Sequence, residues 1–136
     1  KGDARAFSQD TSTMIEKNMR QLVEGICNSF GVSAEVKYET TCPITFNQPE
    51  QSDAATKAAI TLLGEDKCNG DIDPRPFSED FSIMSENTPG CFVLMGNGTS
   101  GSYGRPLHSA DYDFNDELLV KGSSYWVELA EQQLKI

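Results

Sequence analysis

A change of hydrophobic period at Gly31 limits what this chain can fold into more than any other feature of the sequence. From residue 10 to residue 30 apolar side chains recur at steps of three and four, which predicts an amphipathic helix. The stripe consists of Ile15, Met19, Leu22, Ile26 and Phe30. Ser8 or Asp10 can cap the start of this helix, and Gly31 suits the left-handed residue that ends one. From residue 32 to residue 40 apolar and polar side chains alternate, which predicts a strand with one buried face.

Small and apolar residues also alternate from Lys1 to Phe7, as in a strand that is already under way. Residues 1 to 41 are therefore expected to form a strand–helix–strand unit. Such a unit leaves one sheet face and two strand edges exposed unless further strands or another layer cover them. Because the chain also lacks an initiator methionine, we expect it to be a fragment of a longer protein.

Beyond a proline-containing linker at 42–51, the sequence alternates predicted helices with one strand. Three more helices are expected, each preceded by a residue that can cap it. The first is capped by Ser52 or Asp53 and ends at Gly64, and the second is a brief helix from Glu79 to about Ser85 that Ser78 caps. The last is capped by Asn115 and runs towards Gln133. The apolar run 91–95 predicts a strand buried on both faces, and the glycine-rich segment 96–105 a loop. In open α/β sheets ligands bind in loops that follow such strands.

The charge balance narrows the range of partners. Lys and Arg number 11 and Asp and Glu 21, so the net charge is −10 and neither nucleic acid nor an anionic membrane is expected as the main partner. The cysteines Cys27, Cys42, Cys68 and Cys91 lie far apart with no metal-ligand spacing. With no apolar run near the ~18 residues of a membrane helix, we interpret them as reduced thiols of a cytoplasmic protein, a disulfide pair being the alternative.

His108 is the only histidine, and it lies among carboxylates in the predicted loop region. Two interpretations are open: a hydrogen-bonded surface residue, or a metal ligand whose imidazole a neighbouring carboxylate or carbonyl orients. A catalytic metal centre needs three or more converging ligands, so the partners of His108 would have to come from elsewhere.

Three other positions also allow two interpretations. Glu79 and Asp80 form either a charged first helical turn or a pair of carboxylates that points into a cleft. The Arg5 side chain is either solvated on an edge strand or binds a carboxylate through its planar guanidinium group. Gly96 and Gly98 are weak evidence for a nucleotide loop, because the third glycine and a Walker lysine are missing, but the backbone amides of this loop suit a substrate carboxylate.

The order of these motifs is more specific than any one of them. Along the chain they run as Gly2-Asp3-x-Arg5-x-Phe7, a helix, Pro43 with Asn47, Ser78-Glu79-Asp80-Phe81-Ser82, Pro89-Gly90-x-Phe92, Gly96-x-Gly98, Leu107-His108 and Asp113-Phe114. Taken together they resemble the C-terminal half of the metal-dependent aminoacylase, hippurate hydrolase and carboxypeptidase family, in its N-acyl-amino-acid amidohydrolase branch. The resemblance covers essentially the whole chain.

The resemblance implies an α/β fold in two parts. Residues 1–45 would be the second half of a ferredoxin-like lid domain that mediates dimerisation, and residues 46–136 the C-terminal portion of an α/β metallopeptidase-like catalytic domain. It further implies that His108 binds one of two divalent metal ions, zinc first, with manganese, cobalt or nickel as alternatives. Arg5 would bind the carboxylate of an N-acyl amino acid substrate, Gly98 would contact its amide, and Glu79 would support the substrate-binding cleft.

No residue of this chain is assigned a catalytic role. In the family, the remaining metal ligands and the glutamate that acts as general base come from an N-terminal half that nothing here resembles. Three hypotheses follow: part of a metal-dependent amidohydrolase that is inactive alone and forms a homodimer through its lid, a binding module that has lost catalysis, or a small enzyme that uses Glu79 and Asp80 as an acid/base pair.

Overall fold

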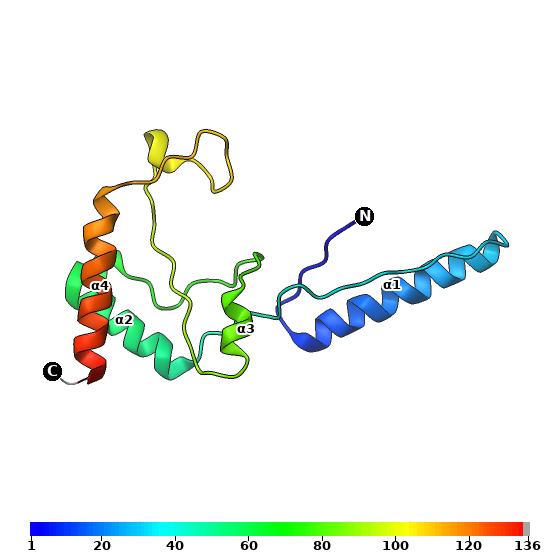
Figure 1. The fold of residues 1–136 in the computed structure, drawn as a ribbon, viewed down its shortest axis with the longest axis horizontal. Helices are drawn as coiled ribbons and strands as arrows, with labels where there is room; N and C mark the ends of the chain where they lie inside the picture. Colours follow the sequence, from blue (N-terminus) through cyan, green and yellow to red (C-terminus); the bar gives the residue numbers. More distant parts are fainter. Residues whose placement is uncertain (135–136) are drawn as a thin grey trace. The chain divides into compact units, whose positions relative to one another are not determined.

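The computed structural model describes residues 1–134, and the regular elements in this range are helical (Figure 1). They are α1 (Gln9–Ser29), α2 (Pro49–Leu63), the 3-10 turn η1 (Glu65–Lys67), α3 (Phe81–Ser85), the 3-10 turn η2 (Gly101–Gly104) and α4 (Glu117–Leu134). None of these helices is long and apolar enough to cross a membrane.

The predicted α/β fold is wrong, because no β-strand forms within residues 1–134. The segments 1–7, 32–40 and 91–95 were expected to be strands of a ferredoxin-like lid and of an α/β catalytic domain, yet none is paired into a sheet. An alternating pattern says which side chains would face a core, but a strand also needs a neighbour for its N–H and C=O groups. The run 91–95 is not buried on both faces either, since Val93, Leu94 and Met95 are exposed.

The chain divides into two compact units. The first comprises residues 1–46 and 73–89, and the second comprises residues 47–72 and the chain from Gly90 onward. The assignment of residues 1–45 to a lid and 46–136 to a catalytic domain stays a prediction.

In the first unit, α1 forms where the apolar stripe predicted it, and both ends are fixed locally. The Ser8 hydroxyl accepts a hydrogen bond from the amide of Thr11 at 3.2 Å, which confirms Ser8 as the cap. At the other end Gly31 has φ 64° and the amide of Val32 reaches the carbonyl of Cys27 at 3.0 Å, a Schellman ending. The extended segment that follows runs back beside α1 (Figure 1), and Arg20 donates to the Val36 carbonyl at 2.9 Å.

In the second unit, α2 packs against α4, and the small core lies between them. Its buried apolar side chains are Ala55, Ala58 and Tyr125. The final helix begins as predicted, since the Asn115 side chain accepts from the Glu117 amide at 3.1 Å. In contrast α2 begins at Pro49 rather than behind Ser52 or Asp53, because proline suits the first turn of a helix, where its missing N–H is not needed.

The short helix of the first unit starts later than predicted. It begins at Phe81, and neither Ser78 nor the N-cap residue Asp80 provides a side-chain cap. Ser82, which is fully buried, instead bonds back to the carbonyl of Glu79 at 2.5 Å. This bond satisfies a carbonyl and not a helix N–H group, so Ser82 does not replace the cap that the sequence assigned to Ser78.

Candidate functional site

His108 lies at the third position of a tight turn from Pro106 to Ser109. The Ser109 amide donates to the Pro106 carbonyl at 3.2 Å, and His108 has φ 69°. It is the one non-glycine residue with positive φ in the part of the chain that the structure describes. A positive φ at this position defines a type II turn, where glycine or asparagine is usual. For histidine the left-handed conformation is uncommon and costs about 1 kcal/mol or more.

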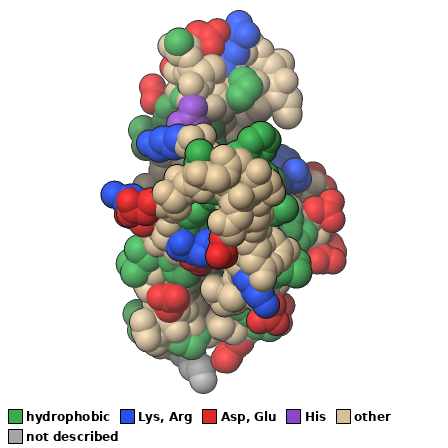
Figure 2. Space-filling view, turned by 90° about the vertical axis from the view of Figure 1, so that its right-hand side faces the viewer, with side chains coloured by type: hydrophobic (Ala, Val, Ile, Leu, Met, Phe, Trp, Pro, Cys, Tyr) green, Lys and Arg blue, Asp and Glu red, His purple; other side chains and the backbone are tan. Residues whose placement is uncertain are grey.

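The imidazole of His108 is displayed on the surface (Figure 2). Around it, the Ser109 hydroxyl donates to the Pro106 carbonyl at 2.6 Å, and Arg105 Nε lies 3.1 Å from Asp111 Oδ2. This ion pair joins the two sides of the turn. The structure thus holds a histidine in an unfavourable backbone conformation with its ring exposed, and its role as a metal ligand stays a prediction.

The loop that carries His108 is tied together at its base by Asn97, which lies between the two glycines that the sequence singled out. The Asn97 side chain donates to the carbonyls of Tyr103 and Asp113 at 3.0 and 2.8 Å, and it accepts from the Asn115 amide at 2.8 Å. Sequence reasoning missed this role. The signal was present, because asparagine side chains commonly bond to nearby backbone in turns.

Gly98 is required by the way this loop crosses itself. Its φ is 149°, and a Cβ at this position would lie 2.8 Å from the Cβ of Tyr103. A Cβ at Gly104 would lie 2.7 Å from the carbonyl carbon of Thr99, so two glycines allow the close crossing of backbone. The predicted contact of Gly98 with a substrate amide stays a prediction, and its packing gives a separate reason for the glycine.

Arg5 and Glu79 belong to the first unit, whereas Gly98 and His108 belong to the second. The Arg5 guanidinium is exposed, and it lies 3.2 Å from the Asp3 carboxylate and donates to the Pro76 carbonyl at 2.8 Å. A substrate carboxylate at Arg5 would therefore compete with Asp3. Glu79 is half-buried, and its backbone carbonyl accepts the Ser82 hydroxyl. Their predicted substrate-binding roles stay predictions.

The donor groups within residues 1–134 do not fit a complete metal centre. No group of three or more His, Cys, Asp or Glu side chains in that range lies close enough to hold a metal ion. His108 is thus at most one ligand of a larger set.

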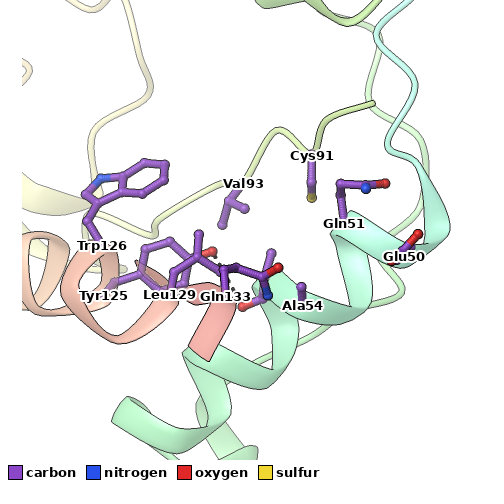
Figure 3. A pocket seen from close by; sticks show the side chains of 10 residues that line it. Glu50, Gln51, Ala54, Cys91, Val93, Tyr125, Trp126, Leu129 and Gln133 are labelled. Carbon is purple, nitrogen blue, oxygen red and sulfur yellow. Dashed lines mark hydrogen bonds between the residues drawn. The ribbon is translucent and has the colours of Figure 1, made fainter. Parts of the chain in front are cut away.

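A cavity of about 310 Å³ lies in the second unit, lined by side chains from α2, the segment 91–95 and α4 (Figure 3). Cys91, Val93 and Trp126 are among its lining residues. Burial raises the pKa of the Cys91 thiol, and a hydrogen bond with Ser52 partly opposes this shift. Burial also raises the pKa of Tyr125, and the nearby Cys91 adds to that shift. All four cysteines are free, and a neutral half-buried thiol is a poor nucleophile.

Comparison with known proteins confirms the resemblance. A family model described as Peptidase family M20/M25/M40 matches residues 5–132. A hippurate hydrolase of Campylobacter jejuni is 30% identical over 99% of this chain and 34% of its own length. An N-acetylcysteine deacetylase of Bacillus subtilis is 32% identical over 95% of this chain and 32% of its own length. A thermostable carboxypeptidase 2 of Saccharolobus solfataricus is 29% identical over 90% of this chain and 30% of its own length. The chain spans about a third of these relatives, and no solved structure matches it.

Proposed function

The chain belongs to peptidase family M20/M25/M40, and from this premise we propose that it is part of a metal-dependent amidohydrolase that cleaves N-acyl amino acids to a carboxylate and an amino acid. The names of two relatives support this substrate class, because hippurate and N-acetylcysteine are both N-acyl amino acids. The family match over residues 5–132 is the observation that carries the proposal.

In this proposal His108 provides one ligand to a divalent metal ion, zinc first, with manganese, cobalt or nickel as alternatives, in a site of two ions. The role is supported by the exposed imidazole of His108 and by the positive φ that its turn maintains. Because residues 1–134 bring no further ligands together, the other ligands and the general base come from a part of the protein that these residues do not contain. Arg5 binds the substrate carboxylate, Gly98 contacts its amide and Glu79 supports the cleft.

The activity test compares the 136-residue chain with the protein encoded by its whole reading frame. With zinc, manganese, cobalt or nickel, the 136-residue chain is expected to leave hippurate and N-acetylcysteine intact, because one histidine cannot build the site. The longer protein is expected to hydrolyse one or both. Full activity of the short chain, or none from the longer protein with any of the metals, contradicts the proposal.

The role of His108 is tested in the longer protein with His108→Asn. Asparagine tolerates the left-handed conformation at φ 69°, so the turn is retained and the imidazole is lost. Hydrolysis and bound metal are expected to fall at least roughly tenfold, the lower end of the losses seen when metal sites are weakened. Gly25→Ala is a control because Gly25 lies in α1, outside the loop of His108, and a Cβ there meets no atom within 4 Å. Unchanged metal content in His108→Asn contradicts the ligand role.

The proposal also includes a homodimer. Along α1 the apolar side chains Leu22, Ile26 and Phe30 are exposed, although exposed apolar stripes are costly in water. A second copy of the chain that packs against this stripe would bury it. The stripe lies within residues 1–45, which the resemblance assigns to a dimerisation domain.

A non-catalytic binding module derived from the same family is the second candidate. The lack of a metal-binding group within residues 1–134 fits this candidate as well as it fits part of a hydrolase. The reading frame upstream of Lys1 distinguishes the two candidates. A start codon directly before Lys1 supports the module. An upstream segment that carries histidines and acidic residues supports the hydrolase.

A further inference from the structure

The side chain of Asn97 bonds to three separate backbone positions of one loop. Its Nδ2 donates to the carbonyls of Tyr103 and Asp113 at 3.0 and 2.8 Å, and its Oδ1 accepts from the Asn115 amide at 2.8 Å. Asn115 returns a bond from its own Nδ2 to the Asn97 carbonyl at 3.3 Å. Asn97 itself is half-buried, and its two bonds with Asn115 are partly buried, whereas its bonds to the Tyr103 and Asp113 carbonyls are exposed.

The two carbonyls that Asn97 binds lie at equal distances along the chain on either side of His108. Tyr103 lies five residues before it (108 − 103 = 5) and Asp113 five residues after it (113 − 108 = 5). One amide group therefore holds together the two stems of the segment that carries the histidine. A second tie lies closer to the tip, where the Arg105–Asp111 ion pair joins positions three residues before and three after His108 (108 − 105 = 3, 111 − 108 = 3).

Asn97 holds the loop by three hydrogen bonds, whereas Arg105 and Asp111 hold it by a single exposed ion pair. The side chains of Arg105 and Asp111 are 56% and 61% exposed, and ion pairs at such sites contribute little and are screened by salt. The turn at His108 also requires support, because its positive φ is unfavourable for histidine. Asn97 provides that support through three side-chain bonds of 2.8 to 3.0 Å that reach both stems of the loop.

We propose that Asn97 is a positioning residue that fixes the backbone of residues 98–114 and thereby the direction in which His108 presents its imidazole. The inference deepens the proposed function, and its importance for activity rests on that proposal. The role requires an amide: an aspartate of the same shape would still accept from Asn115 but would place carboxylate oxygens against the carbonyls of Tyr103 and Asp113.

The test uses NMR on the whole 136-residue chain, in which His108 gives the only imidazole signals. Asn97→Asp is expected to shift and broaden the ring signals of His108 and the amide signals of residues 98–114. The reason is that the hydrogen bonds to the carbonyls of Tyr103 and Asp113, two of the three that the Asn97 side chain makes, are lost. The matched control is Asn47→Asp. Asn47 makes the same kind of clasp in the same unit, donating to the Phe92 carbonyl at 3.0 Å and accepting from the Phe92 amide at 2.8 Å, so its variant should leave the His108 signals unchanged.

Three outcomes separate this inference from the proposed function. His108 and loop signals that are the same in Asn97→Asp as in the unchanged chain overturn the positioning role. The metal content of the longer protein is a separate readout: if His108→Asn leaves it unchanged, the ligand role fails, while the loop signals of the 136-residue chain still decide the role of Asn97. Where His108 is a ligand, Asn97→Asp in the longer protein is expected to weaken the apparent zinc affinity roughly tenfold.

A second variant guards against a general loss of folding. Asn97→Ser keeps a small polar side chain that cannot reach three partners, so it is expected to release the loop while the amide signals of α2 and α4 stay in place. If both variants also lose the α2 and α4 signals, Asn97 supports the folding of the whole unit and the positioning role is overturned.

Discussion

At single residues, backbone conformation and close approach decide what this chain tolerates. Gly98 combines φ 149° with a crossing that would bring a Cβ to 2.8 Å from that of Tyr103. We expect Gly98→Ala to displace the loop and to lower the free energy of unfolding by about 1–3 kcal/mol, the usual cost of a strained backbone position. Urea unfolding followed by circular dichroism measures the change. Gly96→Ala is the control, because its Cβ meets nothing within 4 Å, and equal losses in both variants contradict the prediction.

Cys91 is expected to be the least reactive of the four thiols. Burial raises its pKa, and only the thiolate reacts with an alkylating reagent. At about pH 8, iodoacetamide labelling of the folded chain followed by mass spectrometry should modify Cys91 more slowly than Cys27, Cys42 or Cys68, which are also half-buried. Labelling of Cys91 at the rate of the other three contradicts the prediction.

The same shift links stability to pH. The unfolded chain loses the Cys91 proton near the ordinary pKa of 9.0, whereas the folded chain keeps it to higher pH. The contribution of the neutral thiol is therefore fully present below about pH 9 and is lost as pH rises through the folded pKa. We expect the free energy of unfolding to fall in alkaline solution, less steeply in Cys91→Ala than in the control Cys68→Ala. Tyr125, whose pKa is also raised, contributes to the slope that remains.

The sequence predicted where the chain forms a loop better than it predicted how that loop is held. It placed His108 in a loop, and the structure agrees. It did not predict the left-handed turn or the clasp from Asn97, because these depend on backbone positions up to 18 residues apart that meet only after folding. A pattern of neighbouring residue types carries no information on such a crossing.

At the scale of elements, helices were predictable and strands were not, and the reason is where their hydrogen bonds go. A helix satisfies its backbone internally, so the stripe and caps of α1 were sufficient for a correct prediction. Residues 32–40 have a good alternating pattern, but a strand depends on a distant partner, and none pairs with it within residues 1–134. The predicted caps failed at α2, which begins at Pro49, and at α3, which begins at Phe81 without a side-chain cap.

The packing of α2 against α4 leads to a paired test on one helix. Ala58 is 0% exposed, so Ala58→Leu must displace its neighbours and is expected to cost about 1–3 kcal/mol of unfolding free energy. Ala54 lies one turn earlier and lines the 310 Å³ cavity, so Ala54→Leu has space for the added carbons and should cost little or stabilise. Thermal unfolding by circular dichroism compares the two variants. A larger loss of unfolding free energy in Ala54→Leu than in Ala58→Leu would contradict the prediction that Ala58 is the more tightly packed of the two.

At the scale of the whole molecule, apolar surface and net charge have opposite effects on association. Within residues 1–134 only three apolar side chains are buried, whereas Leu22, Ile26 and Phe30 of α1 are 65%, 59% and 79% exposed. Exposed apolar area favours contact with another copy. Two copies that each carry a net charge of −10 repel one another, and about 0.15 M salt screens that repulsion beyond ~8 Å. Association should therefore strengthen as salt is added, the opposite of an interface held by ion pairs.

This balance allows the α1 stripe to be tested with charge held constant. Sedimentation equilibrium at about 0.15 M salt is expected to detect a dimer of the unchanged chain, and the double variant Leu22→Glu with Ile26→Glu is expected to be monomeric at the same concentration. The double variant Gln21→Glu with Asn28→Glu adds the same two negative charges at exposed polar positions of α1, so it should still dimerise. If both double variants dissociate equally, charge is the cause and the stripe is not the interface. If neither dissociates, the copies meet elsewhere.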